Sequence, residues 1–440
     1  MGKLDELVKE TLSKSEARIT RISDLKDHAG KDVFVRGWVH RQRASTNLSF
    51  VILRDGTGVV QCAVNSNDVS KDTWKNANDV FLESVVYAYG TVAKDERAPE
   101  GYKIKVKELK VYFKGEAFPI GKDQSTEFLL DVRHLWVRSQ YIVNILKFKA
   151  HLMKAARGFL DERGFLEMQP PMLTSSAAEG GATVFNVEYF GKKAYLAQTA
   201  QLYSEAMIEG YPLVYAFAPS FRAEPSRTPR HLTEFWQLEP EMAFYDFEMY
   251  MELAGELVEH LCHEMARKHK DILEKYKRNP QDLLAIKAPF KKMTYENALK
   301  ELKLKWGDGI GLDEEKRLMG ERTQPVFLTN QPKEMRAFYM KINPDDPRTV
   351  LDADLLAPEG IGEIIGGSER VSDYDELVRR LKEQKLKEKD YKWYLELRKY
   401  GSVPHSGFGM GSERLVRWML KLETIRDAIP FPRTMNRLEP

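Results

Sequence analysis

The sequence predicts an α+β protein of two domains: a small five-stranded β-barrel, then an antiparallel sheet flanked by helices. The chain has 440 residues, which is more than one ordinary domain holds. Five short β-rich runs, separated by turn residues, follow one another before residue 115. Beyond residue 139, runs with helical spacing alternate with extended runs, as expected where helices pack on a sheet.

The N-terminal domain is expected to span residues 1–115. Its first 18 residues are charged and predict a short helix or a frayed tail. Asp55-Gly56-Thr57-Gly58 is a hairpin signal between two of the β-rich runs. Five short strands in about 100 residues fit a closed barrel of the oligonucleotide-binding type, and a β-sandwich is the alternative. The predicted strands are 33–39, 48–53, 59–64, 84–92 and 102–113.

A hinge is predicted at 116–138, where Pro119 and Gly121 interrupt regular structure. The second domain then covers 139–440. It opens with a helix over 141–160, whose apolar residues recur at helical spacing over about five turns. Gly164 ends this helix, and an extended segment follows until Pro170-Pro171 stops it.

The rest of the second domain predicts a sheet with a long helix in its middle. Residues 275–345 are irregular and rich in lysine, so we expect a small insert there. Extended runs are expected at 194–197, 214–218, 234–241, 350–367 and from 407 onward, with helices at 246–273 and 413–421.

Composition restricts the class of protein. The net charge of +2 excludes a broadly polycationic chain, although local basic stretches remain available for nucleic acid. The two cysteines, Cys62 and Cys262, lie in apolar surroundings, which favours buried thiols in a reducing compartment. No apolar run reaches 18 residues, and the N-terminus is polar, so a cytoplasmic protein without a membrane span is expected.

Two arginine motifs predict a site for a nucleotide triphosphate. Arg222 lies in Phe221-Arg222-Ala223-Glu224, and Arg414 follows the glycine-rich run that starts at Gly407. Two rigid guanidinium groups on opposite sides of one site suit the two ends of a triphosphate. A hairpin would place Arg222 beside Phe235, which can stack on a base. An ordinary surface hairpin is an equally good explanation of the first motif, and a tight strand-to-helix turn alone explains the second.

Acidic residues in an otherwise apolar run form a third motif. Asp354 and Glu363 are costly to bury without a cation, so they are candidate ligands for Mg²⁺ that bridges phosphates. Arg370 follows seven residues after Glu363 and is placed to bind a small polar substrate. A solvated edge strand is the alternative, which the flanking Ile364-Ile365 disfavours.

Together these motifs resemble the three signature motifs of the class II aminoacyl-tRNA synthetases. The first matches 141–171, the second 221–241 and the third 407–433. With its N-terminal barrel the chain resembles the aspartyl, asparaginyl and lysyl branch, and within it the archaeal-type asparaginyl enzymes. The resemblance implies catalytic roles for Arg222 and Arg414, ATP and Mg²⁺ as cofactors, and Mg²⁺ ligands at Asp354 and Glu363. The implied ATP-binding residues are Arg222, Glu224, Arg230, His231, Leu232, Phe235, Glu363, Gly411 and Arg414.

The resemblance also implies which amino acid is bound. Aspartyl enzymes usually carry a lysine in place of Ser204, and that lysine compensates the substrate's side-chain carboxylate. Its absence removes about half of this compensation, whereas an amide needs no cation. The implied amino-acid ligands are Glu179, Gln201, Glu239, Ser368 and Arg370, and the implied substrate is L-asparagine.

In the barrel, the resemblance implies an anticodon site at Phe50, Gln61 and Arg36. Like Arg36, the residues His40, Arg41 and Arg43 are candidates to hold nearby phosphates. An aromatic platform with an amide that donates and accepts is suited to a uridine. Without the family, Phe50 is more simply explained as barrel core.

The resemblance therefore implies an asparagine–tRNA ligase that acts on tRNA(Asn) as a homodimer. An aspartyl enzyme, including one that charges both tRNAs, is the nearest alternative, and Ser204 argues against it. An amide synthetase of the same catalytic fold is disfavoured by the barrel. A catalytically inactive tRNA-binding paralogue is disfavoured by the retained Arg222, Glu224 and Arg414.

Overall fold

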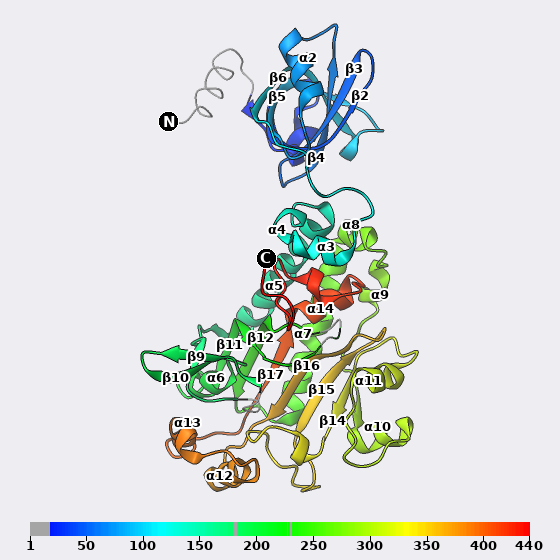
Figure 1. The fold of residues 1–440 in the computed structure, drawn as a ribbon. Helices are drawn as coiled ribbons and strands as arrows, with labels where there is room; N and C mark the ends of the chain where they lie inside the picture. Colours follow the sequence, from blue (N-terminus) through cyan, green and yellow to red (C-terminus); the bar gives the residue numbers. More distant parts are fainter. Residues whose placement is uncertain (1–17, 179–182, 227, 229–230) are drawn as a thin grey trace. The chain divides into compact units, whose positions relative to one another are not determined.

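A computed structural model describes residues 18–178, 183–226, 228 and 231–440 of the chain (Figure 1). The chain divides into two compact units, the first ending at Ser125 and the second beginning at Thr126. Each unit has its own hydrophobic core. Among the described residues, no helix combines the length and the apolar character that a membrane crossing requires.

The first unit is a closed barrel, as predicted, and the β-sandwich alternative is wrong. Its strands run in the order β1-β2-β3-β4-β6-β5, and β2 also pairs with β5, which closes the sheet on itself. Alternate residues such as Val33, Val35 and Val51 point into the core. The strands are β1 (Arg18–Ile19), β2 (Asp32–Ala44), β3 (Leu48–Arg54), β4 (Val59–Asn65), β5 (Val85–Lys94) and β6 (Tyr102–Phe113).

A helix that the sequence did not predict lies between β4 and β5 in the chain. α2 (Lys71–Asp79) begins at Ser70, whose hydroxyl accepts a hydrogen bond from the Thr73 amide at 3.1 Å. The Asn76 side chain donates to the Leu109 carbonyl at 3.0 Å and ties the helix to β6. The buried Ala77 adds to the barrel core.

The predicted hinge at 116–138 is too long. Residues from Thr126 onward already belong to the second unit and form α3 (Thr126–Asp131) and α4 (Arg133–Trp136). The reason is Arg133, which is fully buried and donates to the carbonyls of Ile429 and Pro430, each at 2.8 Å. Such backbone anchoring fixes this segment within the second unit.

The second unit is built on an eight-stranded sheet of order β13-β14-β15-β16-β17-β12-β11-β7. The six strands from β14 to β11 are antiparallel, as predicted, and the edge strands β13 and β7 run parallel to their neighbours. The bounds are β7 (Leu166–Glu167), β11 (Leu213–Phe221), β12 (Glu234–Ala243), β13 (Lys291–Thr294), β14 (Val326–Thr329), β15 (Asp352–Ala357), β16 (Gly362–Glu369) and β17 (His405–Gly411).

The insert predicted at 275–345 is wrong in part, because this segment supplies β13 and β14 to the main sheet. β14 is buried at all four positions, so it lacks the alternation that marks an exposed strand. Its flanking helices α10 (Tyr295–Leu302) and α11 (Leu312–Met319) lie beside this edge of the sheet (Figure 1).

The remaining helices and a small second sheet complete the unit. β8 (Leu173–Thr174), β10 (Lys192–Leu196) and β9 (Asn186–Tyr189) pair in that order. The helix predicted at 246–273 is interrupted at His269, where the backbone leaves the helical region. The helices are α5 (Gln140–Asp161), α6 (Gln201–Met207), α7 (Phe247–Lys268), α8 (Lys270–Lys275), α9 (Pro280–Leu284), α12 (Tyr374–Glu383), α13 (Lys392–Glu396) and α14 (Ser412–Met419).

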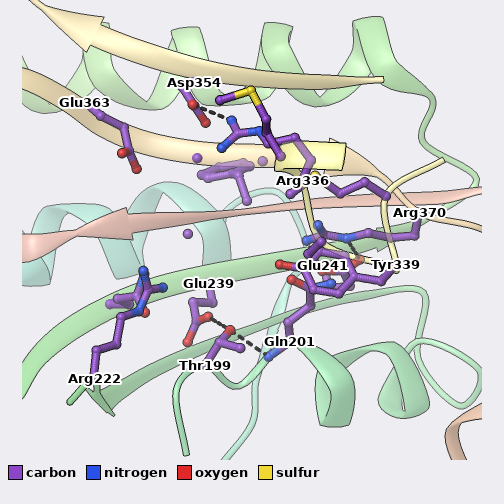
Figure 2. Close-up of a pocket in the computed structure, with 18 of the residues that line it drawn as sticks. Thr199, Gln201, Arg222, Glu239, Glu241, Arg336, Tyr339, Asp354, Glu363 and Arg370 are labelled. Carbon is purple, nitrogen blue, oxygen red and sulfur yellow. Dashed lines mark hydrogen bonds and ion pairs between the residues drawn. The ribbon is translucent and has the colours of Figure 1, made fainter. Parts of the chain in front are cut away.

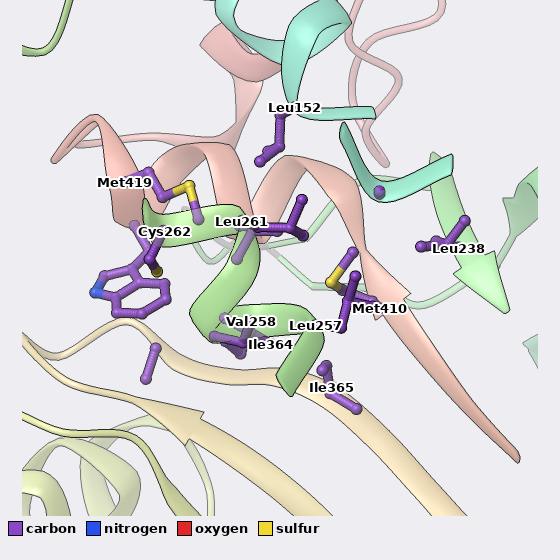
Figure 3. Packing of buried hydrophobic residues seen from close by; sticks show 14 of the residues in the cluster. Leu152, Leu238, Leu257, Val258, Leu261, Cys262, Ile364, Ile365, Met410 and Met419 are labelled. Atoms are coloured by element: carbon purple, nitrogen blue, oxygen red, sulfur yellow. The ribbon is translucent and has the colours of Figure 1, made fainter. Parts of the chain in front are cut away.

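The two faces of the main sheet differ in character. Because side chains alternate along a strand, Leu238 and Met242 of β12 point to one face while Glu239 and Glu241 point to the other. The apolar face packs on α5, α7 and α14, with Leu152 and Leu261 in the same cluster (Figure 3). The opposite face carries the acidic residues, and it is there that a cavity opens.

Candidate active site

A cavity of about 450 Å³ lies over the polar face of the sheet (Figure 2). Four neighbouring strands, β12, β15, β16 and β17, supply much of its lining, and the segment 334–340 before β15 adds to it. Side chains of both charges point into it, including Arg222, Glu239, Asp354, Glu363 and Arg370. A cavity with several convergent charged groups suits a small, charged, polar substrate.

A second hollow continues from this cavity and shares Arg222, Gln237, Glu363 and Gly409 with it. Every residue predicted to bind ATP that the structure describes lines this hollow: Arg222, Glu224, His231, Leu232, Phe235, Glu363, Gly411 and Arg414. Arg230 lies outside the described residues. The structure therefore gathers the two arginine motifs, 190 residues apart in the chain, around one space.

The predicted hairpin forms between β11 and β12. Ser220 pairs with Phe235, and the amide of Arg222 donates to the Thr233 carbonyl at 3.0 Å. The Arg222 guanidinium carbon lies 5.5 Å from the centre of the Phe235 ring. An aromatic face and a cation are thus held side by side, as binding of a base next to its phosphate requires.

Arg414 is placed by the turn from β17 into α14. Its Nη1 atom lies 3.3 Å from Oε2 of Glu363 and donates to the Glu363 carbonyl at 3.1 Å. Gly407, at the start of the glycine run, serves a different purpose from the one predicted. A Cβ atom there would lie 1.9 Å from Oε2 of Glu241, so the glycine makes room for a buried carboxylate rather than for a ligand.

Asp354 and Glu363 converge above Gly366. A Cβ atom on Gly366 would lie 3.3 Å from Oδ1 of Asp354 and 3.2 Å from Oε1 of Glu363. Burial, opposed by Arg336 and reinforced by the charge of Glu363, raises the pKa of Asp354 to about 7. Two carboxylates over a position without a side chain fit the oxygen donors that Mg²⁺ prefers.

Arg336 was missed by the sequence reading. It lies at the end of a short 3₁₀ turn and forms ion pairs with Asp352 and Asp354. The carboxylates of Asp352 and Asp354 outweigh burial and raise the pKa of Arg336. Nothing in the local sequence marks this arginine, because its partners lie on a strand 16 and 18 residues away.

Arg370 and Glu241 form a buried, two-pronged ion pair. Nε and Nη2 of Arg370 donate to the two carboxylate oxygens of Glu241 at 3.0 and 2.9 Å. Burial acts to lower the pKa of Arg370, but the Glu241 carboxylate outweighs it and the pKa is raised. Burial likewise raises the pKa of Glu241, against the effect of Arg370. Glu241, two residues after Glu239 on the same strand face, was also missed.

The other predicted amino-acid ligands separate into two groups. Gln201 and Glu239 line the cavity beside Arg370 (Figure 2). Ser368 does not line it, and its hydroxyl accepts a hydrogen bond from Arg370 at 2.8 Å, so the predicted direct contact is replaced by support of the arginine. Glu179 lies outside the described residues.

Glu239 lines the cavity, whereas Ser204 is buried behind it on α6 (Gln201–Met207) and does not line it. The Glu239 carboxylate accepts hydrogen bonds from the Thr199 hydroxyl and, at 3.0 Å, from the Ala200 amide. Ser204 is buried on α6 and its hydroxyl donates to the Ala200 carbonyl at 3.3 Å. Where the resemblance places the lysine of aspartyl enzymes, this chain therefore has a serine whose hydroxyl bonds to the start of its own helix.

The barrel displays Phe50 and Gln61 on its outer face. Phe50 alternates with the buried Ser49 and Val51 and is not part of the barrel core, so the alternative of a core phenylalanine is wrong. Gln61 pairs with Ile52, which places it diagonally from Phe50 on one face. Arg36 is not brought to this pair, because it lies opposite Tyr87 on β5.

Arg41 and Arg43, which were also expected to hold phosphates, are the arginines that lie beside this pair. Arg43 lies opposite Phe50, and Arg41 lies opposite Ile52. Lys103 of β6 lies beside Gln61, so cations flank the aromatic platform on both sides. A bulge near Val39 shifts the register of β2; Arg36 lies before it, whereas Arg41 and Arg43 follow it.

Comparison with known proteins agrees with this geometry. Residues 125–435 match the family model of class II tRNA synthetases (D, K and N), and residues 33–112 match that of the OB-fold nucleic acid binding domain. An asparagine--tRNA ligase of Thermoplasma acidophilum is 44% identical over 420 residues, which are 94% of this chain and 98% of that protein. One from Thermococcus kodakarensis is 48% identical over 93% of this chain and 96% of that protein.

Solved structures give the same result. The asparaginyl-tRNA synthetase of Pyrococcus horikoshii complexed with asparaginyl-adenylate superposes with a TM-score of 0.93 at 45% identity, covering 96% of this chain and 99% of that one. The chain belongs to the class II tRNA synthetases of the D, K and N group, and it is an aminoacyl-tRNA ligase. Within that group its place is among the asparagine–tRNA ligases, in agreement with the resemblance drawn from its motifs.

Proposed function

We propose that this enzyme activates L-asparagine with ATP, giving asparaginyl-adenylate and pyrophosphate, and transfers the asparaginyl group to tRNA(Asn). The relatives named above support the reaction class, since they are asparagine–tRNA ligases or a synthetase with asparaginyl-adenylate bound. The preference for asparagine over aspartate depends on the net charge of the cavity wall around Arg370 and Glu241.

That charge is already balanced by the protein. The Nε and Nη2 atoms of Arg370 are paired with Glu241, its Nη1 atom donates to Ser368, and Ser204 adds no second cation. A substrate carboxylate placed here would face the Glu241 carboxylate and lack a full counter-ion, which is costly in a buried site. An amide meets both partners, because its oxygen accepts from Arg370 and its NH₂ donates to Glu241.

Activation depends on positioning and on charge neutralisation, with no covalent nucleophile. The α-carboxylate of asparagine attacks the α-phosphorus, and pyrophosphate leaves with the electron pair of the broken P–O bond. Arg222 stabilises the negative charge that develops on the α-phosphate, and Arg414 holds the far end of the triphosphate. Phe235 stacks on adenine, and Glu224 accepts from its amino group. In our proposal Gln201 and Glu239 bind the polar groups of asparagine.

Magnesium is the cation that we assign to Asp354 and Glu363. Their convergence over Gly366 and the raised pKa of Asp354 support a site for a further positive charge beside the ion pairs with Arg336 and Arg414. When bound, the ion supplies positive charge to the phosphate oxygens of ATP. The protein's own part is to hold both carboxylates on neighbouring strands.

Recognition of tRNA is assigned to the outer face of the barrel. Phe50 offers a surface for base stacking, and Gln61 offers a donor and an acceptor on the same face. Arg41, Arg43 and Lys103 are placed to neutralise phosphates nearby. Arg36, which lies opposite Tyr87, is proposed only as a phosphate contact.

The decisive experiment is amino-acid-dependent ATP–pyrophosphate exchange without tRNA, comparing asparagine with aspartate. Exchange with asparagine alone supports the proposal. Exchange with aspartate makes the enzyme an aspartyl or dual-specificity synthetase, and exchange with neither favours an inactive tRNA-binding protein. Arg222→Ala should abolish most of the exchange at unchanged fold, and retention of full activity would overturn the catalytic assignment.

We also propose a homodimer in the cytoplasm. The edge strand β7 exposes Leu166, and β8, the next strand in the chain, exposes Leu173, which suits an interface between two copies. Cys62 and Cys262 are both free and buried, which agrees with a reducing compartment. Sedimentation velocity of the intact chain tests the dimer, and a monomer at micromolar concentration contradicts it.

A further inference from the structure

Gln198 lies beside the active site without lining it. It follows Ala197 at the end of β10 and precedes the cavity residue Thr199, and its side chain is only 2% exposed. Its Oε1 atom accepts from the Ala178 amide at 3.1 Å, and its Nε2 atom donates to the Thr183 hydroxyl at 2.9 Å. A glutamine performs both functions because its amide accepts at one end and donates at the other without a charge.

Thr183 carries this connection to the Arg222 segment. Its carbonyl accepts a hydrogen bond from the Ala223 amide at 2.9 Å. On the other side of Arg222, the Phe221 amide donates to the Ala197 carbonyl, also at 2.9 Å. Both backbone neighbours of Arg222 are thus held by one segment, Ala197–Gln198, which we call the frame. Ala197 holds Phe221 directly, and Gln198 holds Ala223 through Thr183.

The cavity lining is attached to the same frame. Thr199 follows Gln198 in the chain, and its hydroxyl is bonded to the Glu239 carboxylate. Figure 2 shows Thr199 and Arg222 at the same side of the cavity as Glu239. A shift of the frame would therefore move the Arg222 guanidinium relative to bound substrate.

We propose that Gln198 is a positioning residue for Arg222, acting through Thr183. The proposal rests on the catalytic role proposed above for Arg222. Much of the rate acceleration comes from holding the reacting groups in a fixed geometry. A displacement of about 1 Å of such a group therefore lowers the rate roughly 100-fold. A positioning residue of this kind affects kcat for activation and leaves the binding of asparagine largely unchanged.

The test uses Gln198→Met and Thr183→Val in the full-length enzyme. Methionine keeps the length and loses the amide, and valine keeps the shape of threonine while removing only the hydroxyl that accepts from Gln198. We expect Gln198→Met to lower kcat of asparagine-dependent ATP–pyrophosphate exchange by about 10- to 100-fold, with KM for asparagine within roughly twofold of wild type. Thr183→Val should lower kcat in the same direction.

The double variant separates a shared path from two independent effects. If Gln198 acts through Thr183, adding Thr183→Val to Gln198→Met should lower kcat no further. Gln281→Met, on the exposed side of α9, is the matched control and should keep the wild-type kcat. Thermal unfolding of each variant verifies that the fold is kept.

Three results would overturn the positioning role: an unchanged kcat in Gln198→Met, fully additive losses in the double variant, or a loss confined to KM for asparagine. If Gln198→Met does not fold, Thr183→Val decides the question by its kcat alone. The assay is run with aspartate as well. Wild-type exchange with aspartate only would refute the proposed substrate, whereas the same loss of kcat measured with aspartate would still support the role of Gln198.

Discussion

At the scale of single residues, we propose that the Arg370–Glu241 pair decides which amino acid is bound. A free arginine attracts a carboxylate, but an arginine already paired along one edge with a glutamate is largely neutralised. Both groups are buried, so the balance between them is not screened by water. Specificity for an amide then depends on Glu241 as much as on Arg370.

Glu241→Gln should therefore shift the enzyme toward aspartate. The substitution removes the negative charge that compensates Arg370 and weakens the acceptor for the asparagine amide. A hydrogen bond to a charged group is worth about 1.5–3 kcal/mol, so the ratio of kcat/KM for asparagine over aspartate should fall by roughly 10- to 100-fold. ATP–pyrophosphate exchange with each amino acid measures this ratio.

Glu224→Gln is the control for this change, because it removes a similar charge at the adenine end of the site. It should raise KM for ATP and leave the ratio between the two amino acids as in wild type. A Glu241→Gln enzyme that keeps the wild-type ratio would show that Glu241 does not set specificity.

At the scale of elements, the pairing of β2, β3, β4 and β6 brings the barrel's proposed tRNA-binding residues together. Phe50→Ala should weaken tRNA binding, because a stacked base is worth about 1–3 kcal/mol. The expected result is a rise of roughly 5- to 150-fold in KM for tRNA with unchanged ATP–pyrophosphate exchange. Phe113→Ala is the control, since this exposed residue lies at the far end of β6 from Lys103 and Gln61. Equal effects of the two substitutions would contradict the assigned face.

The junction of α7 and α8 predicts a pH dependence. The His269 ring stacks on His151 at 4.4 Å. Burial, and then the charge of His151 and Lys268, lowers the pKa of His269, while Asp271 and Glu264 act in the opposite direction. A histidine with a lowered folded-state pKa binds its proton more readily when unfolded. Stability is therefore fully present above about pH 6.5 and falls as the pH drops below it.

His269→Gln should reduce that loss of stability. Urea midpoints at pH 7.5 and 5.5 measure it, and the difference between the two should be smaller in the variant than in wild type. The exposed His134→Gln is the control and should keep the wild-type difference. An identical pH dependence in His269→Gln and wild type would contradict the prediction.

Some elements could be predicted from the sequence and others could not, depending on whether local patterns or distant contacts determine them. Strands and helices with regular spacing, such as those of the barrel and α5, were found because alternation and helical periodicity are local properties. Both arginine motifs were found because each is a short contiguous run, which is also a local property. The fully buried β14 was missed since it does not alternate, and Arg336 was missed because its partners are set by the pairing of distant strands.

The whole molecule consists of two units whose cores share no residue. The barrel core draws on residues 22–109, and the main core of the second unit draws on residues 142–428. All described residues proposed to bind ATP and asparagine lie in the second unit, whereas Phe50 and Gln61 lie in the first. Activation and tRNA recognition are thus assigned to separately folded parts.

A fragment of residues 126–440 should therefore fold and activate asparagine without the barrel. We expect its kcat for ATP–pyrophosphate exchange to stay within about threefold of the full-length value, because no part of the proposed activation site is lost. Transfer to tRNA should fall much further, since the stacking and phosphate contacts of the barrel are absent. Exchange and aminoacylation assays measure the two steps, and circular dichroism verifies the fold. A folded fragment without exchange would show that the barrel takes part in activation itself.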